Sequence, residues 1–353
     1  MSKFINDRLA RLDAYVPGEQ PRDKAYIKLN TNESPFPPSS GVVAAVNDDE
    51  VKDLRLYCDP ECKKLRASLA ALYNVSEKNI FLSNGSDDIL NFSFMAFGHN
   101  GAAFADITYG FYSVFAELYG IEAEIIPLRD DFSLDVESFI GKNKLIVIAN
   151  PNAPTGIEES MEDIERIIAK NPDSVVVIDE AYVDFGAHST SELTKKYDNL
   201  ICVQTFSKSR SMAGARLGFA IASDALIEDL EKIKYSTNPY NINRLTQIAG
   251  CAAVAENEYY MENCKRIEEN REYTVRSLRE LGFEVLDSKA NFVFAKSDKI
   301  GGEELYLKLK ERGILVRHFT NPKICEYNRI TVGTPEDMET MLCEISSILE
   351  EIK

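Results

Sequence analysis

The chain has 353 residues, 44% of them hydrophobic, and a formal net charge of −17 at pH 7. That length can bury one large core or two moderate ones, and the acidic charge argues against a surface that neutralises nucleic-acid phosphates. Residues 1–15 lack the apolar core of a signal peptide, and no stretch approaches the roughly 20 apolar residues that span a bilayer. The sequence therefore predicts a cytoplasmic protein that binds neither nucleic acid nor membrane.

The cysteines and histidines do not suggest a metal site. Seven scattered cysteines, an odd number, do not form a disulfide framework. Cys58 and Cys62 are four residues apart and could face one another on a helix, but His99, His188 and His318 are too dispersed to complete a set of ligands. We expect reduced thiols, no metal and no Ser-His-Asp triad.

Helical patterns alternate with short β-branched runs, which is typical of an α/β fold with a mainly parallel sheet. Asp59 as a cap and Pro60 in the first turn predict a helix over residues 60–73, and Ser160 predicts the start of another helix. Short apolar runs predict buried strands at residues 79–82, 145–149, 174–179 and 200–206.

The last helix has the clearest pattern on the chain. Thr334 can cap it, Pro335 fits its first position, and the residues from Met338 to Ile352 form an apolar stripe. Helical patterns also dominate the sequence from about residue 246 onward. We expect an N-terminal arm or contribution to a small domain, a large sheet domain and a small C-terminal domain, at residues 1–30, 31–245 and 246–353.

Polar groups follow four of the predicted strands, and ligands of open parallel sheets bind beyond the carboxyl ends of the strands. In chain order these groups are Asn84-Gly85-Ser86-Asp87 before a helix, the loop "NPNAPTG", Asp179 with Tyr182, and Ser207-Lys208 followed by Arg216. Singly, each has an ordinary explanation as a cap, a turn, a solvated carboxylate or a basic surface patch. Their order along the chain is much more specific.

In this order the motifs resemble the fold-type-I pyridoxal-phosphate enzymes, and among them the histidinol-phosphate aminotransferases. The similarity runs nearly from end to end, and its narrowest motifs are "NGSDDIL", "VVVIDEAYVDF" and "TFSKSRSMAGARLGFAIA". The resemblance implies an α/β fold with a large, mainly parallel-sheet domain that binds pyridoxal 5'-phosphate and a smaller α/β C-terminal domain. It also implies transamination between L-histidinol phosphate and 2-oxoglutarate in histidine biosynthesis.

The resemblance also assigns roles toward the cofactor. Lys208 would bond covalently to the cofactor aldehyde and move the substrate proton, Asp179 would pair with the pyridine nitrogen, and Tyr182 would donate to the ring hydroxyl. Tyr109 would stack on the ring, unless it only fills the core. The cofactor phosphate would be held by Gly85, Ser86, Asp87, Ser207 and Arg216, with Arg210 as a further candidate.

One position departs from the family pattern. Relatives commonly have Asn directly before Pro-Thr-Gly, where this chain has Ala153, so we expect Asn152 to make the contact with the ring hydroxyl instead. Ile107 likewise stands where the family has Pro, a change that bears on the stiffness of the loop.

For the substrate, Arg329 matches the arginine that binds the α-carboxylate, and Arg317 matches a position associated with the substrate phosphate, unless it is a solvated surface residue. Three further pocket candidates are Tyr15, Asn32 and Asn241. Tyr57 would cross a two-fold interface to the partner's cofactor phosphate, so the resemblance implies a homodimer with shared active sites. The alternative for Tyr57 is packing beside the helix that follows it.

Other functions stay open at this point. A threonine-phosphate decarboxylase would share the fold, the cofactor and a phosphorylated substrate, and an aromatic amino-acid aminotransferase would share the reaction. A cofactor-binding regulator without catalysis fits least well, because the chain keeps both Lys208 and Asp179 and has no basic DNA-binding surface.

Overall fold

The computed structural model describes residues 2–13 and 15–352, and its largest unit is a seven-stranded sheet in the order β2-β8-β7-β6-β5-β3-β4. β8 is antiparallel to both of its neighbours, and the other neighbouring strands are parallel. The mainly parallel sheet is therefore confirmed. Its strands are β2 (Ile80–Ser83), β3 (Ala102–Ala105), β4 (Ala123–Ile126), β5 (Leu145–Ala149), β6 (Val176–Asp179), β7 (Leu200–Thr205) and β8 (Gly218–Ala222).

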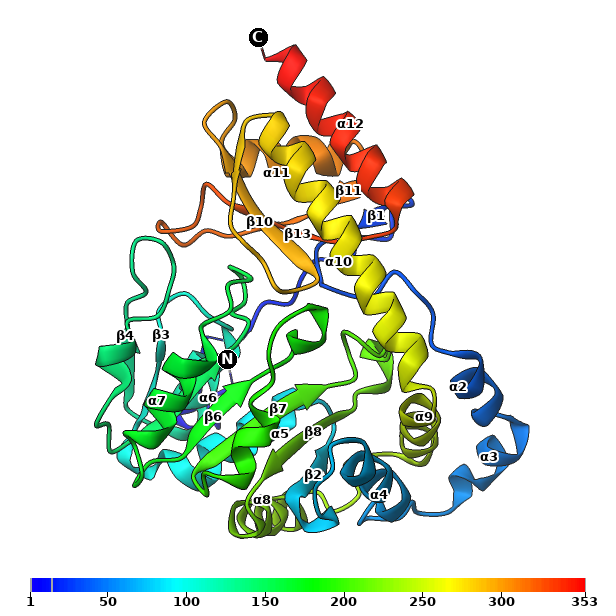
Figure 1. Ribbon diagram of the computed structural model, residues 1–353, viewed down its shortest axis with the longest axis vertical. Helices are drawn as coiled ribbons and strands as arrows, with labels where there is room; N and C mark the ends of the chain where they lie inside the picture. The colour runs from blue at the N-terminus through cyan, green and yellow to red at the C-terminus, as the bar shows by residue number, and fades with distance from the viewer. Residues whose placement is uncertain (1, 14, 353) are drawn as a thin grey trace.

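Helices cover both faces of this sheet (Figure 1). Alternate residues of one strand serve opposite faces: Val147 packs against the α5, α6 and α8 side, whereas Ile146 and Ile148 pack against α7. This double burial explains why the strands read as continuous apolar runs. The helices around the sheet are α4 (Lys63–Leu72), α5 (Ser86–Phe97), α6 (Phe111–Tyr119), α7 (Met161–Ala169), α8 (Asp224–Thr237) and α9 (Arg244–Ala255).

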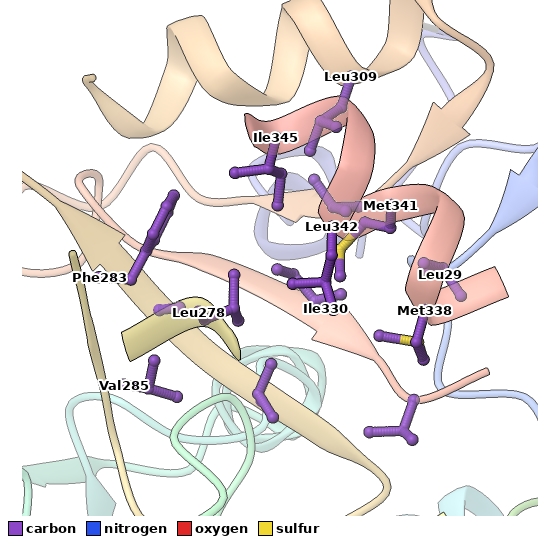
Figure 2. Close-up of a cluster of buried hydrophobic side chains, with 14 of the residues drawn as sticks. Leu29, Leu278, Phe283, Val285, Leu309, Ile330, Met338, Met341, Leu342 and Ile345 are labelled. Atoms are coloured by element: carbon purple, nitrogen blue, oxygen red, sulfur yellow. The ribbon is translucent and has the colours of Figure 1, made fainter. Parts of the chain in front are cut away.

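A second, four-stranded antiparallel sheet has the order β12-β13-β10-β9 and packs against the C-terminal helices. Figure 2 shows α12 residues Met338, Met341 and Ile345 in one apolar cluster with Leu278 of α10 and Ile330 of β13. The elements of this unit are α10 (Asn257–Glu280), β9 (Phe283–Val285), β10 (Phe292–Ser297), α11 (Gly302–Glu311), β11 (Ile314–Leu315), β12 (Arg317–His318), β13 (Asn328–Thr331) and α12 (Pro335–Glu351).

The N-terminal segment joins this second unit through β1 (Ile27–Lys28), which pairs in parallel with β11. The remaining short helices are α1 (Asp7–Ala10), α2 (Ser40–Ala45) and α3 (Asp48–Lys52). In Figure 1, α10 runs from α9 beside the large sheet to α12 in the second unit. The predicted domain boundaries stay a prediction, and residues 1, 14 and 353 lie outside the described residues.

Helix ends follow local capping chemistry. Ser160 caps α7, and Thr334 caps α12 with Pro335 in its first turn, as predicted. The predicted start of the helix over 60–73 is wrong: α4 begins at Lys63, because Cys62 adopts a left-handed backbone with φ 50°. The helices of the described ranges include none that is long and apolar enough to cross a membrane.

Candidate active site

The candidate residues gather at one edge of the large sheet because β2, β5, β6 and β7 all end there. β8 runs the other way, and its first residue, Gly218, pairs with Ser83 at the end of β2 and Thr205 at the end of β7. Arg216, two residues before β8, therefore reaches the same edge as Gly85 and Ser207. The topology brings together residues that lie far apart in the sequence.

A cradle that could hold an anion lies at the start of α5. Gly85 is the N-cap of that helix and supplies no side-chain cap, so the first N–H groups of α5 are available to a ligand. Gly85 has φ 90°, and an added Cβ would lie 2.8 Å from Nη2 of Arg216. Arg216 itself has φ 54°, and its Nη1 donates to Ser207 Oγ at 3.4 Å. The positive φ of Gly85 favours glycine at this position.

The carboxylate of Asp87 ties this cradle to an aromatic group. Arg216 Nη2 lies 3.2 Å from one oxygen of Asp87, and the Tyr109 hydroxyl donates to the other at 2.8 Å. Burial and the Asp87 carboxylate raise the pKa of Tyr109 far above its usual value, so this hydroxyl stays a donor. Tyr15 lies edge-on to Tyr109 at 6.2 Å and stacks on Phe111 at 4.2 Å.

Lys208 follows β7, and its amine contacts the N-terminal segment. Nζ donates to the carbonyl of Thr31 at 3.1 Å and lies 5.8 Å from the ring centre of Tyr182. The Tyr182 hydroxyl accepts from Asn32 Nδ2 at 3.0 Å, and Asn32 has a left-handed backbone with φ 56°. A strained, buried Asn beside a half-buried amine is typical of a functional site.

Asp179 ends β6 with a buried carboxylate. The Tyr112 hydroxyl donates to its Oδ2 at 2.8 Å, and the N–H of Ala181 donates to its Oδ1 at 3.3 Å. Burial raises the pKa of Asp179 to about 6. The group is therefore mainly ionised at neutral pH, and its ionisation lowers the stability of the folded protein. Tyr112 was not among the residues predicted for the site, although a tyrosine one helical turn after Tyr109 could have suggested it.

Two arginines face each other on neighbouring strands of the small sheet. Arg317 of β12 pairs in register with Arg329 of β13. Arg317 donates to the carbonyls of Val16 and Pro17, and Arg329 Nη2 donates to the carbonyl of Asn30 at 3.1 Å. Within the described residues, these backbone carbonyls are the only hydrogen-bond partners of the two guanidinium groups.

Arg329 is the more buried of the two arginines. Its Nε is buried and has no hydrogen-bond partner in the described residues, and burial lowers the pKa of its guanidinium. Its guanidinium carbon lies 5.3 Å from the ring centre of Phe292. Such a group is poised to accept an anion, because an unpaired buried donor is costly.

Arg210 does not join the cradle, so its candidacy for the cofactor phosphate is contradicted. It is 2% exposed, and its Nη1 donates to Asp184 at 2.9 Å while its Nη2 donates to Asn257 at 3.0 Å. A guanidinium this deeply buried needs a carboxylate partner, and Asp184 supplies it.

Two polar candidates are held by neighbouring loops. Asn152 donates to the carbonyl of Ile107 at 2.9 Å and accepts from the Thr108 hydroxyl at 3.0 Å, so its amide secures the loop before Tyr109. Asn241 donates to Ser83 Oγ at 2.7 Å, at the end of β2 and three residues before α5.

Tyr57 lies on the surface of the chain. It is 83% exposed and stacks on Tyr240 at 4.6 Å. Within residues 2–13 and 15–352, no three His, Cys, Asp or Glu side chains form a group that could hold a metal ion.

Comparisons with known proteins identify the family. The family described as Aminotransferase class I and II matches residues 24–345. The histidinol-phosphate aminotransferase of Brachyspira hyodysenteriae is 50% identical over 353 residues, which cover 99% of this chain and 100% of that protein. The histidinol-phosphate aminotransferase of Marinomonas sp. is 48% identical over 355 residues, with the same coverage of 99% and 100%.

A solved structure shares the fold as well. Histidinol-phosphate aminotransferase from Sinorhizobium meliloti, in complex with pyridoxal-5'-phosphate, has a TM-score of 0.88 at 23% identity, covering 100% of this chain and 99% of that one. The chain therefore belongs to the class I and II aminotransferases, and within them to the histidinol-phosphate aminotransferases.

Proposed function

We propose that this aminotransferase uses pyridoxal 5'-phosphate to move an amino group between L-histidinol phosphate and 2-oxoglutarate. The observation that carries the proposal is the meeting, at one sheet edge, of an amine, an anion cradle and a buried carboxylate. These are Lys208, the Gly85–Arg216 cradle and Asp179. The family and its curated members support the same reaction.

The residues at this edge fit the cofactor. The uncapped start of α5, the Arg216 guanidinium and the Ser207 hydroxyl would hold its phosphate. Asp179 would pair with the ring nitrogen, and Tyr182 would donate to the ring hydroxyl. When bound, the cofactor supplies an electron sink that makes the α-hydrogen of the amino donor acidic.

The chain's own residues perform the proton handling. Lys208 would hold the cofactor through its amine. With a donor bound, Nζ would accept the proton from the donor's α-carbon and donate it to the aldehyde carbon of the cofactor. Its 3.1 Å hydrogen bond to the Thr31 carbonyl keeps Nζ at the edge of the sheet. Tyr109 would cover the ring and help to exclude water, as its bond to Asp87 anchors it.

The two arginines suit the two anions of the substrate pair. Arg329, with an unpartnered Nε, would bind the carboxylate of glutamate or 2-oxoglutarate. Arg317 would bind the phosphate of histidinol phosphate. Tyr15, Asn32 and Asn241 would line the same pocket. Asn241 is held by Ser83, and Asn152 by the loop before Tyr109; a contact of Asn152 with the ring hydroxyl stays a prediction.

The active form would be a cytoplasmic homodimer with shared sites. Tyr57 and Tyr240 form an exposed aromatic stack. An exposed aromatic pair of this kind is typical of an interface, and Tyr57 would reach the partner's cofactor phosphate.

A comparison of amino donors tests the substrate. Purified protein with cofactor and 2-oxoglutarate would be given L-histidinol phosphate, L-histidinol, O-phosphothreonine or phenylalanine, and glutamate and CO₂ would be measured. We expect the highest kcat/KM for L-histidinol phosphate and no CO₂. Release of CO₂ from O-phosphothreonine without need for 2-oxoglutarate would identify a decarboxylase, a preference for phenylalanine an aromatic aminotransferase, and absence of any product a binding protein.

A further inference from the structure

Tyr112 is a buried tyrosine whose position is fixed by aromatic packing. It lies in the first turn of α6, and none of its side chain is exposed. Its ring packs edge-on against Phe104 of β3 at 5.9 Å and against Tyr109 at 5.7 Å. Because these contacts hold the ring from two sides, the direction of its hydroxyl is set by the core of the large sheet.

The hydroxyl is directed at Asp179. It donates to Oδ2 at 2.8 Å, while the backbone N–H of Ala181 donates to Oδ1 at the longer distance of 3.3 Å. Across residues 2–13 and 15–352, Tyr112 is the only side chain that hydrogen-bonds this carboxylate. Burial and the Asp179 carboxylate raise the pKa of Tyr112 well above its usual value, so Tyr112 is the donor in this pair.

The other groups around Asp179 oppose its negative charge. Burial is the largest effect, and the carboxylates of Asp87 on α5 and of Glu180, the next residue, also raise its pKa. The hydrogen bonds from Tyr112 and from the N–H of Ala181 act in the opposite direction, and the side-chain bond is the larger of these two. Tyr112 thus supplies the main stabilisation of the charged form of Asp179 in the absence of a bound cation.

We propose that Tyr112 is a positioning residue that keeps Asp179 ionised and turned toward the ring nitrogen of the cofactor. The proposal rests on the proposed role of Asp179 in the reaction. The hydrogen bonds on Oδ2 and Oδ1 together orient the carboxylate, and Oδ1, which accepts only the longer bond from the Ala181 N–H, keeps a second lone pair for a cationic partner. Tyr112 would thereby set the lower pH limit at which the enzyme works.

Removal of this one oxygen atom has a defined consequence. In Tyr112→Phe the buried carboxylate of Asp179 loses its only side-chain donor. Its pKa should therefore rise by about one to two units. At pH 7 a large part of Asp179 would then be neutral and unable to hold a proton on the ring nitrogen. Tyr119→Phe is a matched control, because Tyr119 is on the same helix and its hydroxyl donates to Asn91 at 2.7 Å.

The test uses the full chain in two states. Without cofactor, the stability of wild type, Tyr112→Phe and Tyr119→Phe would be measured by urea unfolding from pH 4 to 8.5. With cofactor and substrates, the pH profile of kcat would be recorded for the same proteins. Stability should fall with rising pH up to a limit set by the pKa of Asp179 in the folded protein. We expect this upper limit to move upward by about one to two units in Tyr112→Phe only, and the acid limb of kcat to move with it.

Several outcomes would overturn the proposal. If Tyr112→Phe lowers stability or kcat by the same factor at every pH, the tyrosine only fills space. If the double variant Asp179→Asn/Tyr112→Phe still shows the shifted pH dependence of stability seen in Tyr112→Phe, the titrating group is not Asp179. A shifted stability profile with an unshifted kcat profile would refute the link to turnover, and would leave the proposed aminotransferase function untouched.

Discussion

Single residues of the site carry charges that the fold buries without full compensation. Burial raises the pKa of Asp179 to about 6 and lowers the pKa of Arg329, whose Nε has no partner in the described part of the chain. Groups buried in this way destabilise the empty protein, and a bound ligand of opposite charge supplies the missing partner. The buried charges of the site therefore lower the stability of the protein without ligand and increase its affinity for a ligand of opposite charge.

This loss of stability predicts the behaviour of Asp179→Asn. The pKa of Asp179 is about 6 in the fold against an ordinary 3.8, so between these values the native state holds a proton that the unfolded chain has released. Ionisation of Asp179 thus contributes a loss of stability of about 3 kcal/mol as pH rises from 4 to 7. We expect cofactor-free Asp179→Asn to be more stable than wild type at pH 7.5 and to lose that advantage at pH 4, measured by urea unfolding.

The control for this prediction is the addition of the cofactor. Wild type should gain more stability from it than Asp179→Asn, since only the carboxylate can pair with a cationic ring. An equal difference between the two proteins at every pH would show that Asp179 is not a strained carboxylate.

Arg317→Ala and Arg329→Ala form a matched pair of variants, because the two residues are direct partners on β12 and β13. Arg329→Ala should raise KM for both glutamate and 2-oxoglutarate by about 30-fold or more, as it removes a desolvated charge pair. Arg317→Ala should lower kcat/KM for L-histidinol phosphate and leave that for unphosphorylated L-histidinol unchanged. If both donors suffer equally from Arg317→Ala, the residue does not recognise the phosphate.

The residues of this edge were predictable to different degrees. Lys208 and Asp179 follow apolar runs, and the ends of buried strands can be read from the sequence. Tyr112 was missed because a tyrosine on an apolar helix face looks like core. Arg210 was misassigned because its partner, Asp184, lies 26 residues away, and a sequence does not reveal which carboxylate a buried guanidinium will meet.

Among the elements, α12 was predicted almost to the residue and α4 was not. The start of α12 depends on neighbours in the chain: Thr334 and Asp337 form a capping box, and Pro335 occupies the first turn. The start of α4 depends on the left-handed backbone of Cys62, for which the sequence has no reliable signature. Helix caps formed by neighbouring residues can be predicted from a sequence, whereas a backbone conformation imposed by packing cannot.

The apolar stripe of α12 predicts a stability difference along one helix. Ile345 is fully buried against the C-terminal core, whereas Ile352 is 38% exposed at the end of the helix. Ile345→Ala should lower the free energy of unfolding by about 2 to 5 kcal/mol. Ile352→Ala should change it by about 0.5 kcal/mol at most. Urea unfolding measures both, and equal losses would show that this face of α12 does not hold the small sheet.

At the scale of the whole molecule, the site needs contributions from distant parts of the chain. The carbonyl of Thr31 contacts Lys208, and β1 of the same N-terminal segment pairs with β11 of the second unit. Tyr57 is 83% exposed on the surface of the single chain. The proposed dimer would place this exposed aromatic side chain in the partner's site.

Hybrid dimers test the shared site. Mixing Tyr57→Ala with Lys208→Ala subunits gives hybrids in which one site has both defects and the other has neither. With random exchange, about half of the dimers are hybrids with one intact site each, so activity should recover to about a quarter of the wild-type value. Each parent must first be shown to be nearly inactive. Verified hybrids with no recovery would mean that Tyr57 acts within its own subunit.

The most direct measurement of the proposed reaction is the fate of the donor nitrogen. Protein with cofactor would be incubated with ¹⁵N-amino-labelled L-histidinol phosphate and unlabelled 2-oxoglutarate, and glutamate would be analysed by mass spectrometry. We predict ¹⁵N-glutamate in step with loss of the donor, and none with Lys208→Ala. Unlabelled glutamate, or consumption of the donor without any glutamate, would contradict transamination at this site.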